Sequence, residues 1–364
     1  FATAGLLDGL RSCSSPFGGA EFLDHQGHRA IGIELPVGFV GPNGHPPVVA
    51  FDQPTVERML REAAIGAGAD LRFGADVAAL DGNKLTLSDG ATITGRWVLG
   101  SDGARSTVRR QLGIELENQG FDEDWVVVDT TLLDPDLSLS SLVTQYSDRI
   151  VTYIPGHGTH RRWEFQLRKG ETRAEMASPE RIAELLSPWG SSNQLQVDRI
   201  AVYRFHAVVA ERLRVGDVFL AGDAGHQMPP FNGQGMCSGM RDVENLIWKL
   251  AAVAASHADE RLLDTYHAER RRHVTGQVEH AVDAGRLINA IAEGGADSFE
   301  AGYGGGREFP HLETGLRCGN HRLIGHPFPQ PFTEDGGFDR QLGDGIALVT
   351  TASTHIPPDV MDRW

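Results

Sequence analysis

Apolar positions recur every three to four residues in several parts of the chain, and this period predicts helices. One such stretch covers residues 53–65, where Asp52 precedes the first turn and Pro54 lies inside it. A longer stretch over 263–293 mixes apolar residues with charges of both signs. A shorter helix is expected over 105–112. We therefore predict three separate helices here, in addition to the helix that follows residue 233.

Alternating or short continuous apolar runs predict strands elsewhere. The segments 124–168 and 198–206 contain such runs without intervening helices, which favours an antiparallel sheet separate from the rest of the fold. Turn residues at Asp89-Gly90 predict a hairpin. The two arms of this hairpin lie within residues 85–95. Further strands are expected at 70–80, 97–99 and 218–221.

Composition narrows the classes of function. The 364 residues carry 33 Lys and Arg against 49 Asp and Glu, a net charge of −16 that argues against nucleic-acid binding. The cysteines Cys13, Cys237 and Cys318 form no CxxC pair, so we expect free thiols and no metal site. No apolar run approaches the roughly 20 residues of a membrane span, and we expect no signal peptide. A cytoplasmic location is the expectation.

A first candidate site follows the strand at 97–99. Asp102 comes where open α/β sheets bind ligands, and Gly103 permits close approach of the backbone. Arg105 or Arg109 could then meet a pyrophosphate. The alternative is a plain strand–turn–helix in which Ser106 caps the helix and Arg109 pairs with a surface acid.

A second candidate site follows the strand at 218–221. Gly222-Asp223 places one carboxylate at a sheet edge, where it could accept hydrogen bonds from sugar-type hydroxyls. A loop containing Gly233, Gly235 and Gly239 then begins a helix whose bare start offers unpaired N–H groups to an electron-rich ligand. The alternative is that these glycines only allow tight packing.

Both sites resemble motifs of one enzyme family. GSDGARSTVRR resembles the "DG" motif, and GDVFLAGDAGHQMPPFNGQGMCSGMRDVENLIWKLA the "GD" motif, of single-component FAD-dependent aromatic hydroxylases. FDQPTVERML is similar to the family's helix whose Gln lies along the flavin chain. Within the family, RRWEFQLRKGE and AVYRFHA most resemble the 3-(3-hydroxyphenyl)propionate hydroxylases, although phenol, resorcinol and polyketide hydroxylases share most of these features.

The resemblance implies an α/β fold with α+β elements. A Rossmann-like FAD-binding domain would comprise residues 1–123 and 207–293, with a sheet domain for the substrate inserted at 124–206. Residues 294–364 would be a loop and the start of a thioredoxin-like domain. The family's first βαβ unit and its GxGxxG turn are missing. Because the chain opens at Phe1 and ends after a strand-like run, we expect a piece of a longer protein.

The resemblance also assigns the flavin contacts. Asp223 would bind a ribityl hydroxyl, and the N–H groups of 233–235 would face the flavin ring. Cys237 stands where the family often has Asn. His226 is expected to fix the loop by hydrogen bonding, with a proton shuttle as the alternative. The complete set of expected FAD contacts is Gln53, Asp102, Gly103, Arg105, Gly222, Asp223, Pro229, Gly233, Gln234, Gly235 and Met236.

The implied reaction uses NADH or NADPH, FAD and O₂. A flavin hydroperoxide would hydroxylate a phenol, and the expected substrate is a phenylpropanoid-type acid. Because the phenol is activated by partial deprotonation, a group of the protein must take the phenolic proton. Tyr203 and His206 are the candidates, although alternation puts them on opposite strand faces, and core or structural roles are the alternatives. Pro230 would lie beside the reactive flavin edge. Arg162 could bind the substrate carboxylate and Trp163 its ring, with a surface position and the core as alternatives.

Two other classes of function remain open at this point. A flavin-dependent halogenase would share both Gly-Asp sites, but the sequence lacks a WxWxIP-type segment. A cofactor-poor, non-catalytic fragment or binding protein with the same fold is the second alternative. The expected partners are a small phenol and O₂, without nucleic acid or a membrane span, and the family is compatible with a homodimer.

Overall fold

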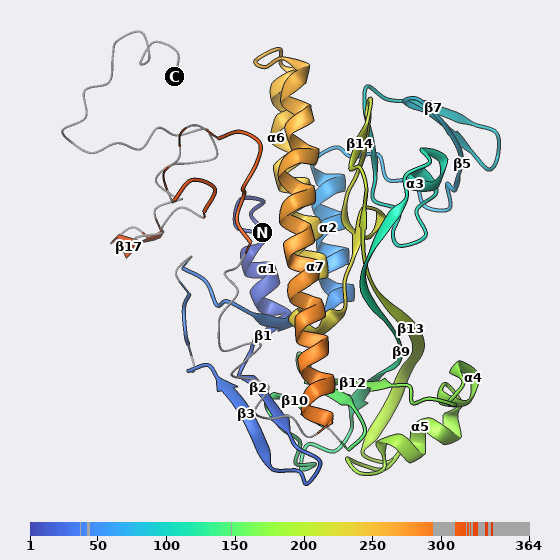
Figure 1. Cartoon of the computed structure of the whole chain (residues 1–364), viewed down its shortest axis with the longest axis vertical. Helices are drawn as coiled ribbons and strands as arrows, with labels where there is room; N and C mark the ends of the chain where they lie inside the picture. Colours follow the sequence, from blue (N-terminus) through green and yellow to red (C-terminus); the bar gives the residue numbers. More distant parts are fainter. Residues whose placement is uncertain are drawn as a thin grey trace.

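The protein is described by a computed structural model (Figure 1). It covers residues 1–293 apart from 37, 42, 43 and 147, and residues 310–326 apart from 318, 320 and 322. It also covers the two short strands β17 (Phe332–Thr333) and β18 (Gly336–Gly337). The expected thioredoxin-like start and the strand near residue 345 otherwise lie outside the described residues.

An eight-stranded sheet forms the largest part of the fold. Its two long strands are β9 (Leu116–Leu132) and β13 (Leu195–Ala210), which pair antiparallel. The strand order is β16-β13-β9-β12-β11-β10-β2-β3. The other members are β2 (Gly19–Leu23), β3 (Arg29–Glu34), β10 (Val143–Tyr146), β11 (Val151–Pro155), β12 (His160–Gln166) and β16 (His226–Gln227).

The antiparallel sheet predicted for 124–168 and 198–206 is therefore present, but it is larger than expected. Strands β9 and β13 cross the expected domain boundaries, so the division into domains stays a prediction. Strands β2 and β3 join its far edge, and β2 pairs parallel to β10. The pattern of apolar residues does not predict these two strands, because they are short and interrupted by glycine and charged residues.

A second sheet brings the two Gly-Asp sites together. Strands β14 (Arg214–Val215), β15 (Val218–Leu220) and β8 (Val98–Gly100) form it, and β15 runs parallel to β8. Leu220 lies opposite Gly100, and the Ala221 amide donates to the Gly100 carbonyl at 3.0 Å. Since parallel strands end at one edge, the turns after both strands are neighbours.

The predicted helices are present. Helix α2 (Gln53–Gly66) is capped by Asp52, α3 (Thr107–Gln111) by Ser106, and α7 (Asp264–Ala292) is the expected long helix. Helix α6 (Gly235–Ala254) follows the glycine loop. The remaining helices are α1 (Leu7–Ser12), α4 (Arg173–Met176), α5 (Pro179–Leu186) and the 3₁₀ turns η1 (Gly222–Ala224), η2 (Pro230–Asn232) and η3 (Glu260–Leu263).

The strand expected over 70–80 is wrong in its first part. Only β5 (Val77–Asp81) forms, because Phe73 stays 75% exposed and Gly74 adopts φ +70°, which interrupts an extended strand. The hairpin is confirmed: β6 (Lys84–Leu87) pairs with β7 (Thr92–Thr94) around Gly90. A further pair joins β1 (Ser14–Pro16) to β4 (Val49–Phe51).

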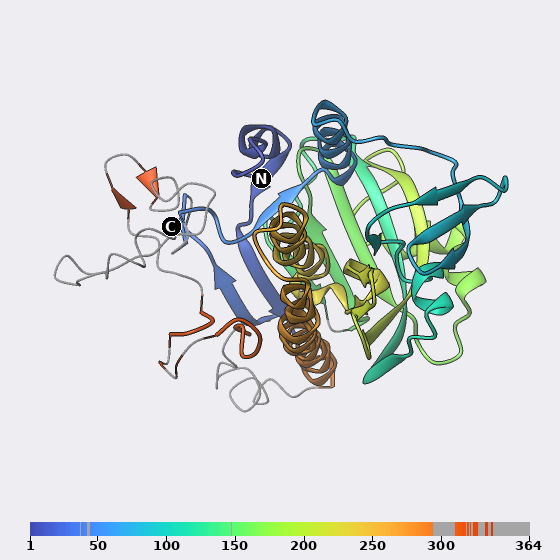
Figure 2. The same ribbon diagram turned by 90° about the horizontal axis from the view of Figure 1, so that it is seen from above.

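The eight-stranded sheet has two different faces. We call one the α5 face, because its apolar side chains pack on α5; it includes Trp163 and Phe165 of β12. The opposite α7 face contacts the long helix α7, beside which α6 also runs (Figures 1 and 2). The α7 face carries Trp125, Phe205 and, from η2, Phe231, whose rings lie within 6.3 Å of one another. Side chains of one strand therefore lie in two different environments, depending on the face to which they point.

Within the described residues, no helix is long and apolar enough to cross a membrane. No cluster of three or more His, Cys, Asp or Glu with metal-binding geometry occurs in that same part of the chain. Cys13 and Cys237 are free thiols, as expected.

Candidate functional site

Arg109 joins the two Gly-Asp turns. Its guanidinium Nη1 donates to the Ala224 carbonyl at 2.9 Å and its Nη2 to the Ala104 carbonyl at 3.0 Å. The side chain is buried, and this burial lowers its pKa. Arg109 therefore holds the two loops against each other. The sequence suggested a pyrophosphate contact or a pairing with a surface acid, and within the described residues the structure shows neither of these for Arg109.

Asp102 also stabilises the first Gly-Asp turn. Its carboxylate accepts hydrogen bonds from the Ser106 hydroxyl and from the amides of Thr107, at 2.7 Å, and Val108, at 3.1 Å. Burial opposes ionisation, but these hydrogen bonds outweigh it and lower the pKa of Asp102. The beginning of α3 is thus capped by Asp102 and Ser106, while Arg105 remains exposed to solvent.

Asp223 behaves differently from Asp102. Among the described residues its carboxylate has no hydrogen-bond donor. The protein surrounding it raises the pKa by desolvation, against an attraction from His226, even though the side chain remains accessible to solvent. Asp223 is therefore a solvent-accessible carboxylate that is partly surrounded by protein. Such a carboxylate is available to hydroxyl donors of a ligand.

The start of α6 lies beside this carboxylate. Gly233 adopts φ +61°, and a Cβ built on Gly233 or Gly235 would meet no atom within 4 Å. Gln234 provides no side-chain cap, because its amide oxygen accepts from Arg241 instead. No side chain therefore covers the start of α6 at these glycines or caps its first N–H groups, which is the arrangement that leaves room for an electron-rich ligand.

Close packing of glycines fixes α6 against the second turn. A Cβ on Gly239 would lie 3.3 Å from the Gly222 Cα, so a larger residue would push the helix away. Gly222 itself adopts φ +59°, a conformation that side chains rarely take. Tight packing and ligand access are thus both present in this glycine loop, at different glycines.

A buried ionic network holds the same turn from behind. Asp242 of α6 accepts from the Gly222 amide at 3.0 Å and from Arg270 of α7 at 2.8 Å, and its other partner is His226 at 2.6 Å. Burial opposes the charge of Asp242, but the His226 hydrogen bond, the attraction of Arg270 and the Gly222 amide outweigh it and lower the pKa of Asp242. The loop-fixing role expected for His226 is confirmed. Asp242 was not among the predicted site residues, because its only signal in the sequence is a carboxylate on the buried side of a helix.

Tyr203 lies on the α7 face, near the loop that begins α6. Its ring stacks on Phe205 at 6.4 Å, and Phe205 in turn contacts Phe231, the residue after Pro230. The Tyr203 hydroxyl accepts from Arg199, and the side chain is 38% exposed. Tyr203 is thus a partly exposed residue that is connected through Phe205 to the residue following Pro230.

Arg162 belongs to an ionic row on the same face. Its Nε donates to Asp129 at 2.7 Å, and Arg199 approaches the same carboxylate at 3.4 Å. Burial would lower the pKa of Arg162, but the bond to Asp129 raises it overall. His160 approaches Asp129 at 3.3 Å as well. Two guanidinium groups share one carboxylate, so this row keeps a net positive charge.

Three other expected site residues lie elsewhere. His206 pairs with Asp122 at 3.3 Å together with Arg204, on the strand face opposite Tyr203. Trp163 is fully buried in the α5-face core, away from the surface that Tyr203 and Arg162 share, because successive side chains alternate. Gln53 begins α2, where its amide donates to a neighbouring glutamate of that helix.

A row of buried polar residues was not predicted. Gln145, Thr152 and Glu164 are register partners on β10, β11 and β12, and each is less than 10% exposed. Gln145 and Thr152 bond to each other at 2.8 and 3.0 Å. Glu164 has no hydrogen-bond partner among the described residues, and burial raises its pKa to about 7. The signal in the sequence was RRWEFQ, where Trp and Phe alternate with charged and polar residues.

Comparisons with known proteins identify the family. A family model described as FAD binding domain matches residues 1–281. The chain is 34% identical over 313 residues to a probable NADH-specific resorcinol 4-hydroxylase of Rhodococcus jostii, covering 81% of this chain and 57% of that protein. It is 32% identical over 302 residues to a 3-(3-hydroxy-phenyl)propionate/3-hydroxycinnamic acid hydroxylase of Escherichia coli, covering 79% and 53%.

This chain belongs to the FAD-binding-domain family. Among solved structures, the complex of aklavinone-11 hydroxylase with FAD and aklavinone is similar to it, with a TM-score of 0.69 and 26% identity over 79% of this chain and 60% of that one. The expected fold class and the expected resemblance to aromatic hydroxylases are confirmed. The chain spans little more than half the length of the two hydroxylases named above.

The residues at the two turns fit the cofactor of this family. A flavin needs hydroxyl acceptors along its ribityl chain and N–H donors at its pyrimidine ring. The unpaired Asp223 carboxylate and the open, side-chain-free start of α6 at Gly233 and Gly235 offer these groups side by side. This fit concerns the ribityl chain and the flavin ring of the cofactor. The GxGxxG turn that holds the pyrophosphate in this family is not in the sequence.

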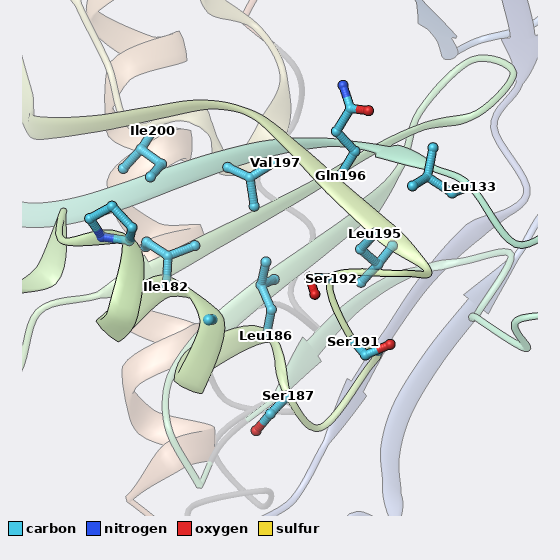
Figure 3. A pocket seen from close by; sticks show the side chains of 13 residues that line it. Leu133, Ile182, Leu186, Ser187, Ser191, Ser192, Leu195, Gln196, Val197 and Ile200 are labelled. Atoms are coloured by element: carbon cyan, nitrogen blue, oxygen red, sulfur yellow. The ribbon is translucent and has the colours of Figure 1, made fainter.

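A cavity of about 550 Å³ lies in another part of the molecule (Figure 3). It is lined by α5 and the start of β13, with Ile182, Leu186 and Val197 among its apolar walls. In Figure 1 α5 lies at the opposite end of the long strands from β14, and the cavity belongs to the α5 face. It is therefore separate from the Gly-Asp turns.

Proposed function

We propose that this chain provides the flavin- and substrate-binding part of a phenol ring hydroxylase that uses NADH or NADPH and O₂. The observation that carries the proposal is the unpaired Asp223 carboxylate beside the open start of α6, in a chain whose relatives include two phenol hydroxylases. When bound, FAD supplies the electron transfer from the nicotinamide and the activation of O₂ that ring hydroxylation requires.

The chain's own residues would bind and orient this cofactor. Asp223 would accept hydrogen bonds from ribityl hydroxyls, and the amides from Gln234 to Met236 would face the electron-rich edge of the ring, since the Gly233 amide donates to the Pro230 carbonyl at 2.8 Å. Arg109 and Asp102 would act indirectly, because both hold the loops in place. The exposed Arg105 would remain free to meet the nicotinamide cofactor as it arrives.

The substrate would lie over the α7 face of the sheet. Tyr203 supports this location, because its partly exposed side chain lies on the face that carries the Phe231 loop. We infer that the Tyr203 hydroxyl accepts a hydrogen bond from the phenol and orients it, while Pro230 shapes the wall beside the ring. The net positive charge that Arg162 and Arg199 share around Asp129 supports a phenylpropanoid-type acid, whose carboxylate would reach this row.

Cofactor retention in matched variants tests the proposal. Asp223→Ala removes charge-assisted hydrogen bonds worth roughly 1.5–3 kcal/mol, so the Kd for FAD should rise about tenfold or more. Asp217→Ala is the control, since Asp217 is an exposed carboxylate at the other end of β15. Flavin fluorescence quenching measures both. Equal Kd values for the two variants would remove Asp223 from the site, and chloride-dependent halogenation without ring hydroxylation would refute the proposed reaction.

A further inference from the structure

Glu164 is an unexplained polar group on the α7 face of the sheet, where the proposed substrate would lie. Its side chain is 4% exposed and has no hydrogen-bond partner among the described residues. A buried polar group without a partner costs free energy, and native proteins rarely keep one without a reason. Its neighbours in the row, Gln145 and Thr152, bond to each other and make no hydrogen bond to Glu164.

The direction of the Glu164 side chain follows from its strand. Trp163 and Phe165 lie in the α5-face core, so the residues between and beside them point to the α7 face. Gln166 confirms this direction, because its amide donates to Asn289 of α7 at 3.3 Å. Glu164 therefore lies on the face that carries Tyr203 and Arg162.

The surroundings of Glu164 define what it can bind. Across the sheet its partners are Thr152 on one side and the apolar Val127 on the other. The charged groups that influence it are Arg162, which favours its ionised form, and Asp129, which opposes it. Because Asp129 occupies the Arg162 guanidinium, Glu164 lacks a committed counter-ion. A carboxyl in this position accepts a hydrogen bond from a hydroxyl and repels a second carboxylate.

We propose that Glu164 is a specificity residue that receives a ring hydroxyl of the substrate and excludes a carboxylate bonded directly to the ring at that place. The proposal rests on the proposed function, and it adds the substrate class: phenols with a free hydroxyl facing β12. Glu164 and Arg162 are two residues apart, about 7 Å along the strand. A substrate carboxylate on a flexible side chain can reach the Arg162 row, whereas a benzoate carboxylate would meet Glu164.

Two probes of similar size test this selectivity. Resorcinol carries a hydroxyl where 3-hydroxybenzoate carries a carboxylate, and neither probe changes charge near neutral pH. We expect the FAD-loaded protein to bind resorcinol more tightly, as measured by ultraviolet difference titration. Glu164→Gln keeps the size and a hydrogen-bonding amide but removes the charge, so the preference should shrink by on the order of tenfold. Asp124→Asn, on the opposite strand face, should leave the preference unchanged.

A second measurement keeps the proposal testable if the variant does not fold. In the wild-type protein the preference for resorcinol should increase as pH rises through the range where Glu164 loses its proton, because the repulsion then appears. An unchanged preference in Glu164→Gln, or a wild-type preference independent of pH, would overturn the role of Glu164 alone. A wild-type protein that binds FAD poorly and neither probe would instead overturn the proposed function.

Discussion

Replacing Glu164 by Gln should make the protein more stable, and the gain should depend on pH. Burial raises the pKa of Glu164 from 4.5 to about 7, so the folded protein keeps a proton that the unfolded chain releases between these values. The free energy of unfolding therefore falls as pH rises from 4.5 to 7. At about 1.4 kcal/mol for each pH unit, the full loss amounts to about 3 kcal/mol. Gln cannot ionise and avoids this loss.

Denaturant unfolding of the wild type and Glu164→Gln, below and above this pH window, measures the effect. The difference between the two proteins should be small at the acidic end and should grow to about 3 kcal/mol in favour of Gln at the alkaline end. Glu62→Gln, on the exposed side of α2, is the control that removes a charge without burial. If Glu164→Gln is instead the less stable protein at alkaline pH, Arg162 holds an ionised Glu164 and the reasoning is wrong.

Three further predictions concern the surrounding groups. Arg162→Ala should raise KM for carboxylate-bearing phenols about tenfold more than for neutral phenols, because the row around Asp129 loses its net charge; equal effects in steady-state kinetics would remove Arg162 from the site. Asp242→Asn should cost about 3–5 kcal/mol in denaturant unfolding, because Arg270 stays buried without its counter-ion, and a loss below about 1 kcal/mol would assign the network little weight. His206→Ala should leave kcat and KM unchanged, since His206 pairs with Asp122 on the face opposite Tyr203; a fall in kcat would return it to the list of candidate bases.

The sequence by itself determined the elements whose signals are local. Residues 53–65 have the period and the Asp52 cap of a helix, and Asp89-Gly90 has the chemistry of a tight turn, so α2 and the β6–β7 hairpin were predictable. The two Gly-Asp motifs also identified the family, because their residue types and order are specific to it. Such features need only neighbouring residues, and the chain therefore encodes them directly.

Only the tertiary structure decided which side chains share a surface and which partners they have. Arg109 could have met a ligand, but the fold places its guanidinium on the carbonyl of Ala224, 115 residues away. Trp163 and Glu164 are adjacent in sequence, yet one fills the α5-face core and the other stays unpartnered on the α7 face. Pairing between distant strands, and the helix that covers each face, set these environments. The local alternation of apolar and polar residues determines neither the strand pairing nor the covering helix. It predicts that a strand has two faces, but not which face the substrate would contact.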